Sequence, residues 1–165
     1  MTARIEDSEV ARARAIAASV PDPEIPFVTI ADLGILRNVE RHGSGIVVQL
    51  TPTYTGCAAT LAIRLDVEHA LAAAGLDHAR VETVLSPAWS TDDITAEGRR
   101  KLREHGIAPP PARGKGSLLF AEESVTCPRC GATDCTRISE FGSTPCKALW
   151  RCEQCREPFD VFKCL

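Results

Sequence analysis

The alternation of hydrophobic and polar positions changes period several times along the first hundred residues. Residues 7–20 place apolar side chains on one face of a helix and charged side chains on the others. The PDPEIP segment that follows has three prolines, which lack a backbone donor and restrict the residues before them. The pattern therefore predicts a first helix that ends at about residue 20.

The next segment has the shorter period of strands. FVTI (27–30) and ILRNVE (35–40) are predicted to be short strands around a turn at Asp32 and Gly34. GIVVQL (45–50) is the clearest candidate for a buried strand.

The helical period returns at 57–75, where Ile63, Val67 and Leu71 form one ridge and Gly75 marks the end of the helix. A strand at 80–85 and a helix at 90–106, capped by Ser90 or Thr91, complete the series. The order αββαβα predicts an α+β fold, a small two-layer domain that spans residues 1–105.

The periodicity ends in a segment rich in proline and glycine. Residues 106–119 are predicted to be a linker between domains. Residues 120–165 are too few for a hydrophobic core that is stable alone, so we expect a metal ion to hold them together.

This C-terminal segment has two CxxC pairs, CPRC (127–130) and CEQC (152–155), separated by residues 131–151. Two such pairs supply the four sulfurs of a tetrahedral site. TRISEF (136–141), KALWRC (147–152) and EPFDVFKC (157–164) are predicted to be strands. The pattern is that of a zinc ribbon, whose four ligands would be Cys127, Cys130, Cys152 and Cys155.

The role of this ribbon leaves alternatives open. Four thiolates leave no open position on a metal ion, which favours a structural zinc site over redox or cluster-transfer work, although four thiolates also suit iron. Cys135, Cys146 and Cys164 are additional. They could be inert buried thiols or could form a second, open metal site.

Composition narrows the class of protein. The chain of 165 residues has no apolar run of the roughly 20 residues that cross a bilayer, so we expect a cytoplasmic protein without a membrane span. Eight cysteines in that compartment favour metal binding over disulfides. The net charge of -3 argues against nucleic acid as a partner.

One cysteine stands far from the others. Cys57 lies in TPTYTGCAAT (51–60), where the first turn of the predicted helix favours a thiolate. Asp22 and Glu24, on the proline-bracketed loop, could lie opposite it. Alternatively, Cys57 is only a small residue at a helix start and Asp22 only caps a turn.

Three stretches together resemble the PaaD-type branch of the metal-sulfur cluster biosynthesis (SufT-like) family. They are DPEIPFVTIADLGIL (22–36), VVQLTPTYTGCAAT (47–60) and the cysteine tail with SEFGST (139–144). The broad family acts in iron-sulfur protein maturation, and this branch is encoded with the multicomponent phenylacetyl-CoA epoxidase of aerobic phenylacetate degradation. One departure is Ala58, which replaces a proline that is common in the family.

The resemblance implies a non-catalytic accessory protein that helps to mature an oxygenase. The family's reactive cysteine corresponds to Cys57 and its acidic loop to Asp22 and Glu24, which would bind iron or an iron-sulfur cluster transiently. Its partners would be the epoxidase oxygenase subunits and their iron-sulfur reductase, and a homodimer could pair two Cys57 thiolates. Three other hypotheses are a structural adaptor of the epoxidase complex, a thiol redox enzyme, and a nucleic-acid-binding ribbon.

Overall fold

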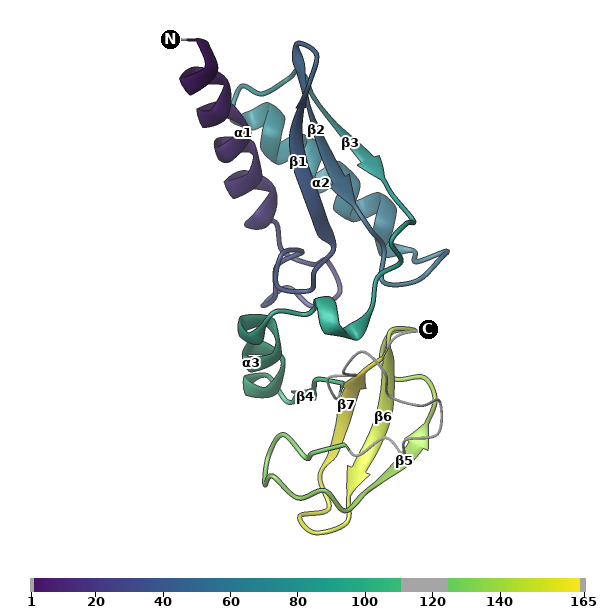
Figure 1. The fold of residues 1–165 in the computed structure, drawn as a ribbon. Helices are drawn as coiled ribbons and strands as arrows, with labels where there is room; N and C mark the ends of the chain where they lie inside the picture. Colours follow the sequence, from purple (N-terminus) through teal and green to yellow (C-terminus); the bar gives the residue numbers. More distant parts are fainter. Residues whose placement is uncertain (1, 111–124, 164–165) are drawn as a thin grey trace. The chain divides into compact units, whose positions relative to one another are not determined.

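The computed structural model describes residues 2–110 and 125–163 and divides the chain into two compact units, Met1–Trp89 and Ser90–Leu165 (Figure 1). The first unit contains α1 (Thr2–Ala18), β1 (Leu36–His42), β2 (Gly45–Leu50), α2 (Ala59–Ala73) and β3 (Ala79–Thr83). The second contains η1 (Thr91–Asp93), α3 (Ala96–Glu104), β4 (Ile107–Ala108), β5 (Cys135–Ser139), β6 (Lys147–Cys152) and β7 (Pro158–Phe162).

The first unit is a sheet covered by helices. Its strand order is β1-β2-β3, with β1 antiparallel and β3 parallel to the central β2. The parallel pair needs a crossover connection, and α2 supplies it. The buried ridge of α2 includes Ile63, Val67 and Leu71 as predicted, while Ile46 and Val48 of β2 are fully buried.

Two loops of the first unit meet at the end of the sheet where β2 terminates. The backbone N–H of Thr51 donates to the Ile35 carbonyl at 2.8 Å, joining the segment after α1 to the segment before α2. The backbone N–H of Val84 donates to the Leu50 carbonyl at 2.8 Å, which brings the chain after β3 to the same end. The segments that carry Asp22 and Cys57 therefore share one end of the sheet.

The predicted strand at 27–30 is wrong. This segment forms turns, with a single antiparallel bridge between Pro21 and Thr29. Side chains hold the turns, because Asp32 accepts a hydrogen bond from the backbone N–H of Thr29 at 2.9 Å and the Thr29 hydroxyl accepts one from that of Asp32 at 3.1 Å. Such local bonds compete with strand pairing.

In the second unit the predicted helix at 90–106 is interrupted. A 3-10 turn, η1, is followed by Ile94 in extended conformation, and α3 begins only after Thr95. The Thr95 side chain accepts a hydrogen bond from the backbone N–H of Gly98 at 3.0 Å and so caps α3. Ile94 is buried, so the break inserts an apolar side chain into the core.

The ribbon sheet has the order β4-β7-β6-β5. β5, β6 and β7 form an antiparallel sheet at the predicted positions, and β4 pairs in parallel with β7. β4 corrects the predicted start of the linker, because Ile107 and Ala108 are buried members of the ribbon sheet. The domain boundaries at 105 and 119 otherwise remain a prediction, since the compact units divide after Trp89.

An α+β domain followed by a four-cysteine ribbon is therefore confirmed as the fold class. Within the described residues, no helix combines the length and the apolarity that crossing a membrane requires.

Candidate functional site

The four cysteines of the two CxxC pairs lie together in the ribbon. The Sγ atoms of Cys127, Cys130, Cys152 and Cys155 all lie within 4.8 Å of one another. The Cys127 and Cys155 sulfurs are 3.8 Å apart, and those of Cys130 and Cys152 are 3.5 Å apart. Four sulfurs at about 2.3 Å from one tetrahedral ion would be about 3.8 Å from each other. The donor set therefore fits zinc in both chemistry and spacing.

The two CxxC turns share one backbone design. The backbone N–H groups of Gly131 and Arg156 donate to the carbonyls of Cys127 and Cys152, respectively, each at 3.0 Å. Gly131 has φ +76° and Arg156 has φ +64°, so both occupy the left-handed region. Glycine enters this region without strain, whereas arginine is strained there by its Cβ. The second turn thus reproduces the first without its glycine.

The site lies against the ribbon core rather than apart from it. The buried cluster of this unit includes the thiol residues Cys127 and Cys152 beside Trp150 and Phe159. Cys152 is fully buried, whereas Cys130 is exposed. A metal ion at this position would tie the two turns to the apolar core of the sheet.

Without a metal ion, the four thiols are not equivalent. The pKa of Cys152 is lowered to about 6, chiefly because the backbone N–H of Cys155 donates to its sulfur at 3.4 Å, while desolvation acts in the opposite direction. The pKa of Cys130 is raised to about 12, because the lowering by the Ala132 backbone is outweighed by desolvation and by the neighbouring thiols. The cluster therefore holds protons that a metal ion must displace.

Cys135 and Cys146 do not form a site together, which corrects the prediction of a second centre that contains both. Cys135 pairs with Cys152 across β5 and β6, whereas Cys146 comes immediately before the first residue of β6. The length of β6 separates them by roughly 20 Å at about 3.3 Å per residue. Cys164, the third member, lies outside the described residues.

Cys135 is instead a fifth thiol beside the four-cysteine site, a position that was not predicted from the sequence. It packs against the ribbon core, and its Sγ donates to the Ala132 carbonyl at 3.6 Å. Burial, followed by the charges of Cys152 and Cys127, raises the pKa of Cys135 to about 11. The signal available in the sequence was its place immediately before the predicted strand at 136–141, because the predicted hairpin partner at 147–152 ends at Cys152.

Cys57 is half-buried and lies two residues before α2. Its carbonyl accepts a hydrogen bond from the backbone N–H of Thr60 at 3.1 Å, and no side chain caps the start of α2 at Ala58. Ala58 has φ -62°, the value that a proline would fix, so the turn forms without the family's proline. Gly56, at φ +90°, allows the sharp bend before the thiol.

Asp22 is buried and shapes its own turn. Its Oδ1 accepts hydrogen bonds from the backbone N–H groups of Glu24 and Ile25, each at 2.9 Å. Among the described residues, no group of three or more metal donors includes Cys57, Asp22 or Glu24. A transient site on these residues therefore remains a prediction.

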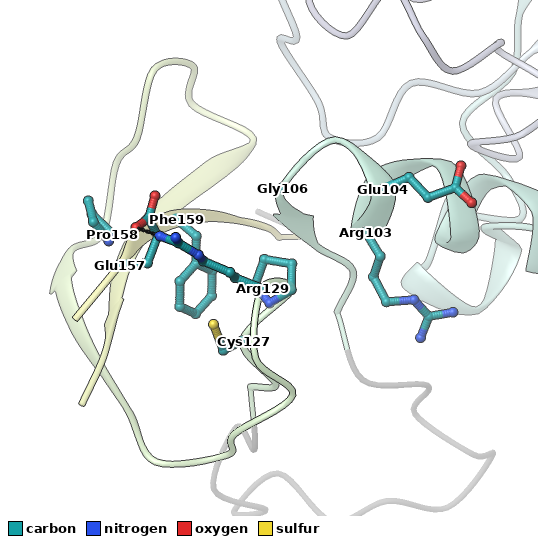
Figure 2. Close-up of a pocket in the computed structure, with 9 residues that line it drawn as sticks. Arg103, Glu104, Gly106, Cys127, Arg129, Glu157, Pro158 and Phe159 are labelled. Carbon is teal, nitrogen blue, oxygen red and sulfur yellow. Dashed lines mark hydrogen bonds and ion pairs between the residues drawn. The ribbon is translucent and has the colours of Figure 1, made fainter. Parts of the chain in front are cut away.

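A cavity of about 310 Å³ adjoins the first CxxC turn (Figure 2). It is lined on one side by Arg103, Glu104 and Gly106, at the end of α3. On the ribbon side Arg129 forms an ion pair with Glu157, next to Phe159. The cavity thus presents charges of both signs near Cys127, and no single class of ligand follows from them.

Two family models match the chain. Residues 11–85 match the model of the iron-sulfur cluster assembly protein family, and residues 111–163 match that of the PaaD zinc beta ribbon domain. Cys57 lies in the first match and the four-cysteine site in the second. The division between the two cysteine sites therefore follows a division between two families.

The chain is also similar to individual proteins. It is 47% identical over 163 residues to an Escherichia coli (strain K12) protein that is named as a subunit of a "Putative 1,2-phenylacetyl-CoA epoxidase", and the match covers 99% of this chain and 98% of that one. A crystal structure of DUF59, a domain of unknown function from Bacillus anthracis, matches with a TM-score of 0.55 and 25% identity. That match covers 61% of this chain and 96% of the other.

Proposed function

This chain belongs to the PaaD family of phenylacetyl-CoA epoxidase subunits, and on that premise we propose that it is a non-catalytic maturation protein of the epoxidase. It would assist iron or iron-sulfur cluster assembly in the oxygenase or in its iron-sulfur reductase. Two observations support the proposal: the E. coli relative is named as an epoxidase subunit, and residues 11–85 match the iron-sulfur cluster assembly protein family. We expect the protein to act in the cytoplasm, where its clients are made.

The observation that carries this proposal is the position of Cys57. It is the only cysteine of residues 1–89, and it lies half-buried on a loop at the end of the sheet, within the assembly-protein match. A ligand that must bind iron and release it cannot be locked into a closed cage. A single half-buried thiol on a loop meets that requirement, because one sulfur ligand leaves the other coordination positions of iron open.

Carboxylates from the neighbouring loop would complete the transient site. Asp22 is buried and its Oδ1 holds the turn, whereas Glu24 is half-buried, so the Glu24 carboxylate is the more accessible of the two. One thiolate and one or two carboxylates do not saturate iron. A second copy of the chain, contributing its own Cys57, or the client protein would supply the remaining ligands.

We assign the four-cysteine site to a structural zinc ion, held by Cys127, Cys130, Cys152 and Cys155. When bound, the ion would cross-link the two CxxC turns. Its four thiolate ligands would leave no coordination position open. The residues of the chain do the rest: the backbone N–H of Cys155 stabilises the Cys152 thiolate, and Gly131 and Arg156 shape the two turns. The ribbon would thereby present a fixed surface to the epoxidase subunits.

The experiment is a measurement of iron in the purified oxygenase and reductase after co-expression with this protein, with its Cys57→Ala variant, or without it. We expect client iron to fall equally in the last two cases, while the variant retains its zinc. Thr55→Ala, an exposed change in the same loop, is the matched control and should support full iron occupancy. Unchanged iron in all preparations would contradict the proposal.

A structural adaptor is the second candidate, and the designation of the E. coli relative as a subunit favours it. An adaptor would co-purify with the oxygenase in a fixed ratio, and Cys57→Ala would not disturb that ratio. A maturation protein would bind transiently and in less than stoichiometric amounts. Size-exclusion chromatography of the co-expressed proteins distinguishes the two.

A further inference from the structure

We propose that Cys135 and Cys152 form a peroxide-sensitive thiol pair, whose disulfide removes a ligand from the four-cysteine site and releases its metal ion. Cys135 is not one of the four clustered donors, so its sulfur stays available when the site is loaded. The inference rests on the proposed metal site and is independent of the maturation role of Cys57.

The strand register brings the two residues within reach of each other. Cys135 and Cys152 are direct partners in the antiparallel β5–β6 pair. The backbone N–H of Glu153 donates to the Asp134 carbonyl at 2.9 Å, so the pair next to the cysteines is a hydrogen-bonded pair. Because the two kinds of pair alternate along antiparallel strands, Cys135 and Cys152 form a non-hydrogen-bonded pair. At such positions the Cα atoms are about 4.5 Å apart and the side chains are close. This separation lies inside the range of about 4.4–6.8 Å that disulfides span.

The Cys135 side chain lies beside the first CxxC turn. Its Sγ donates to the Ala132 carbonyl at 3.6 Å, and the same carbonyl accepts a hydrogen bond from the backbone N–H of Cys127 at 2.8 Å. Its contact with the ribbon core fixes it on the side of the sheet that carries the metal ligands. Forming a disulfide would therefore require side-chain rotation and only a small movement of the backbone.

The two thiols differ in accessibility. Cys135 is half-buried and belongs to β5, which is the outermost strand of the sheet, whereas Cys152 is fully buried. In the loaded protein the metal ion also occupies the Cys152 sulfur. A small oxidant such as hydrogen peroxide would therefore meet Cys135 first.

The reaction has two steps. The Cys135 thiol first loses its proton, and the thiolate attacks one oxygen of hydrogen peroxide. The O–O bond breaks, Cys135 becomes a sulfenic acid, and the released hydroxide takes up the proton and leaves as water. The Cys152 thiolate then attacks that sulfur, its bond to the metal breaks, an S–S bond forms, and hydroxide leaves. Each sulfur loses one electron, and peroxide gains two.

Loss of Cys152 would leave three thiolates on the ion, so the second CxxC turn would be held by Cys155 alone and its tie to the first turn would weaken. Metal sites closed by four thiolates hold their ion far better than incomplete ones. The expected result is release of the ion together with loss of the ribbon structure. Reduction of the disulfide would restore the fourth ligand and allow the site to reload.

The test uses the full chain, loaded with zinc, in a Cys57→Ser background so that no thiol of the first unit responds. Stoichiometric hydrogen peroxide is added, released zinc is followed with a chromophoric chelator, and disulfides are mapped by mass spectrometry of non-reduced peptides. We expect zinc release with a Cys135–Cys152 linkage. Cys135→Ser should release zinc severalfold more slowly, whereas Cys146→Ser, which changes the cysteine at the other end of β6, should behave like the parent.

Each other outcome is decisive. A linkage of Cys130 to Cys152 or of Cys127 to Cys155, or equally fast release from Cys135→Ser, would overturn the inference. Zinc content before oxidation shows whether the Cys135→Ser variant folds. If it does not fold, Cys135→Ala serves as a second variant. A parent protein that binds no zinc would overturn the metal site itself, whereas the iron content of client proteins tests the maturation role separately.

Discussion

The two units of this chain use cysteine in opposite ways. The first holds its fold with aliphatic side chains, among them the fully buried Ile46, Val48 and Val67, and its single thiol lies on a loop outside that core. In the second, Cys127 and Cys152 are themselves members of the buried cluster. A cysteine can serve as a transfer ligand where the fold does not need it, and it becomes structural where the core is too small without it.

This difference explains why one chain combines the two units. The unit with a complete core can use a thiol for chemistry with little loss of stability. The ribbon, by contrast, depends on its metal site for cohesion, because it buries few large apolar side chains. The contrast can be tested by removing the metal ion from the ribbon and a buried apolar side chain from the first unit.

The largest effect is expected from removal of the metal ion. Structural zinc contributes on the order of 10 kcal/mol to small metal-dependent folds, so chelation should unfold the ribbon and leave the first unit folded. Amide NMR signals should collapse for residues 125–163 and remain dispersed for residues 8–89. Retention of the β5–β7 signals after complete zinc removal would contradict the contrast.

A smaller effect is expected from a cavity in the first unit. Leu71 is 1% exposed on the sheet side of α2, and Leu71→Ala should reduce the free energy of unfolding of that unit by about 2–5 kcal/mol. Urea denaturation of the zinc-loaded protein measures it, and zinc content should not change. Leu65→Ala, on the same helix but 43% exposed, is the control and should change stability by no more than about 0.5 kcal/mol.

The smallest effect concerns the two CxxC turns. Gly131→Ala places a side chain at φ +76°, where the strain should cost about 1–2 kcal/mol and weaken zinc binding about five- to thirtyfold. Space is not the cause, since a Cβ at this position would meet nothing within 4 Å. Competition with a calibrated chelator gives the zinc affinity.

The matched variant is Arg156→Gly in the second turn. It removes the strain at φ +64° and an exposed ion pair with Glu153, which is worth little. Zinc affinity should therefore not fall. A loss of affinity as large as that of Gly131→Ala would show that the two turns are not equivalent.

Much of this architecture could be predicted from the sequence, and the reasons are local. β2 contains the apolar run Ile46, Val47 and Val48, and β5 and β6 lie between the two CxxC pairs, so the sequence indicates where these strands lie. The segment 27–30 has the alternating pattern of a strand because Val28 and Ile30 are apolar. In the structure these two side chains are buried although the segment forms turns, which hydrogen bonds to the carboxylates of Asp22 and Asp32 stabilise. Apolar residues indicate burial, and only the pairing partner decides between strand and turn.

The sites show the same limit. The CxxC spacing predicted the four-cysteine cluster because each pair is a local turn. The place of Cys135 beside it depends on the register of β5 against β6, and the separation of Cys135 from Cys146 depends on the length of β6. Both are properties of strand pairing that residue spacing does not reveal. The transient site that we propose at Cys57 has no such local signature and rests on family resemblance.

The two residues of β4 have a consequence for self-association. Unpaired strand edges are templates for aggregation, and natural sheets protect them with short covering strands. Ile107 and Ala108 pair with Asp160 and Val161 and so cover the β7 edge of the ribbon sheet. A fragment that began after Ala108 would expose this edge, and with it the buried face of Val161, to other copies of itself. A metal-binding sequence alone would not make that fragment behave as an isolated, monodisperse domain.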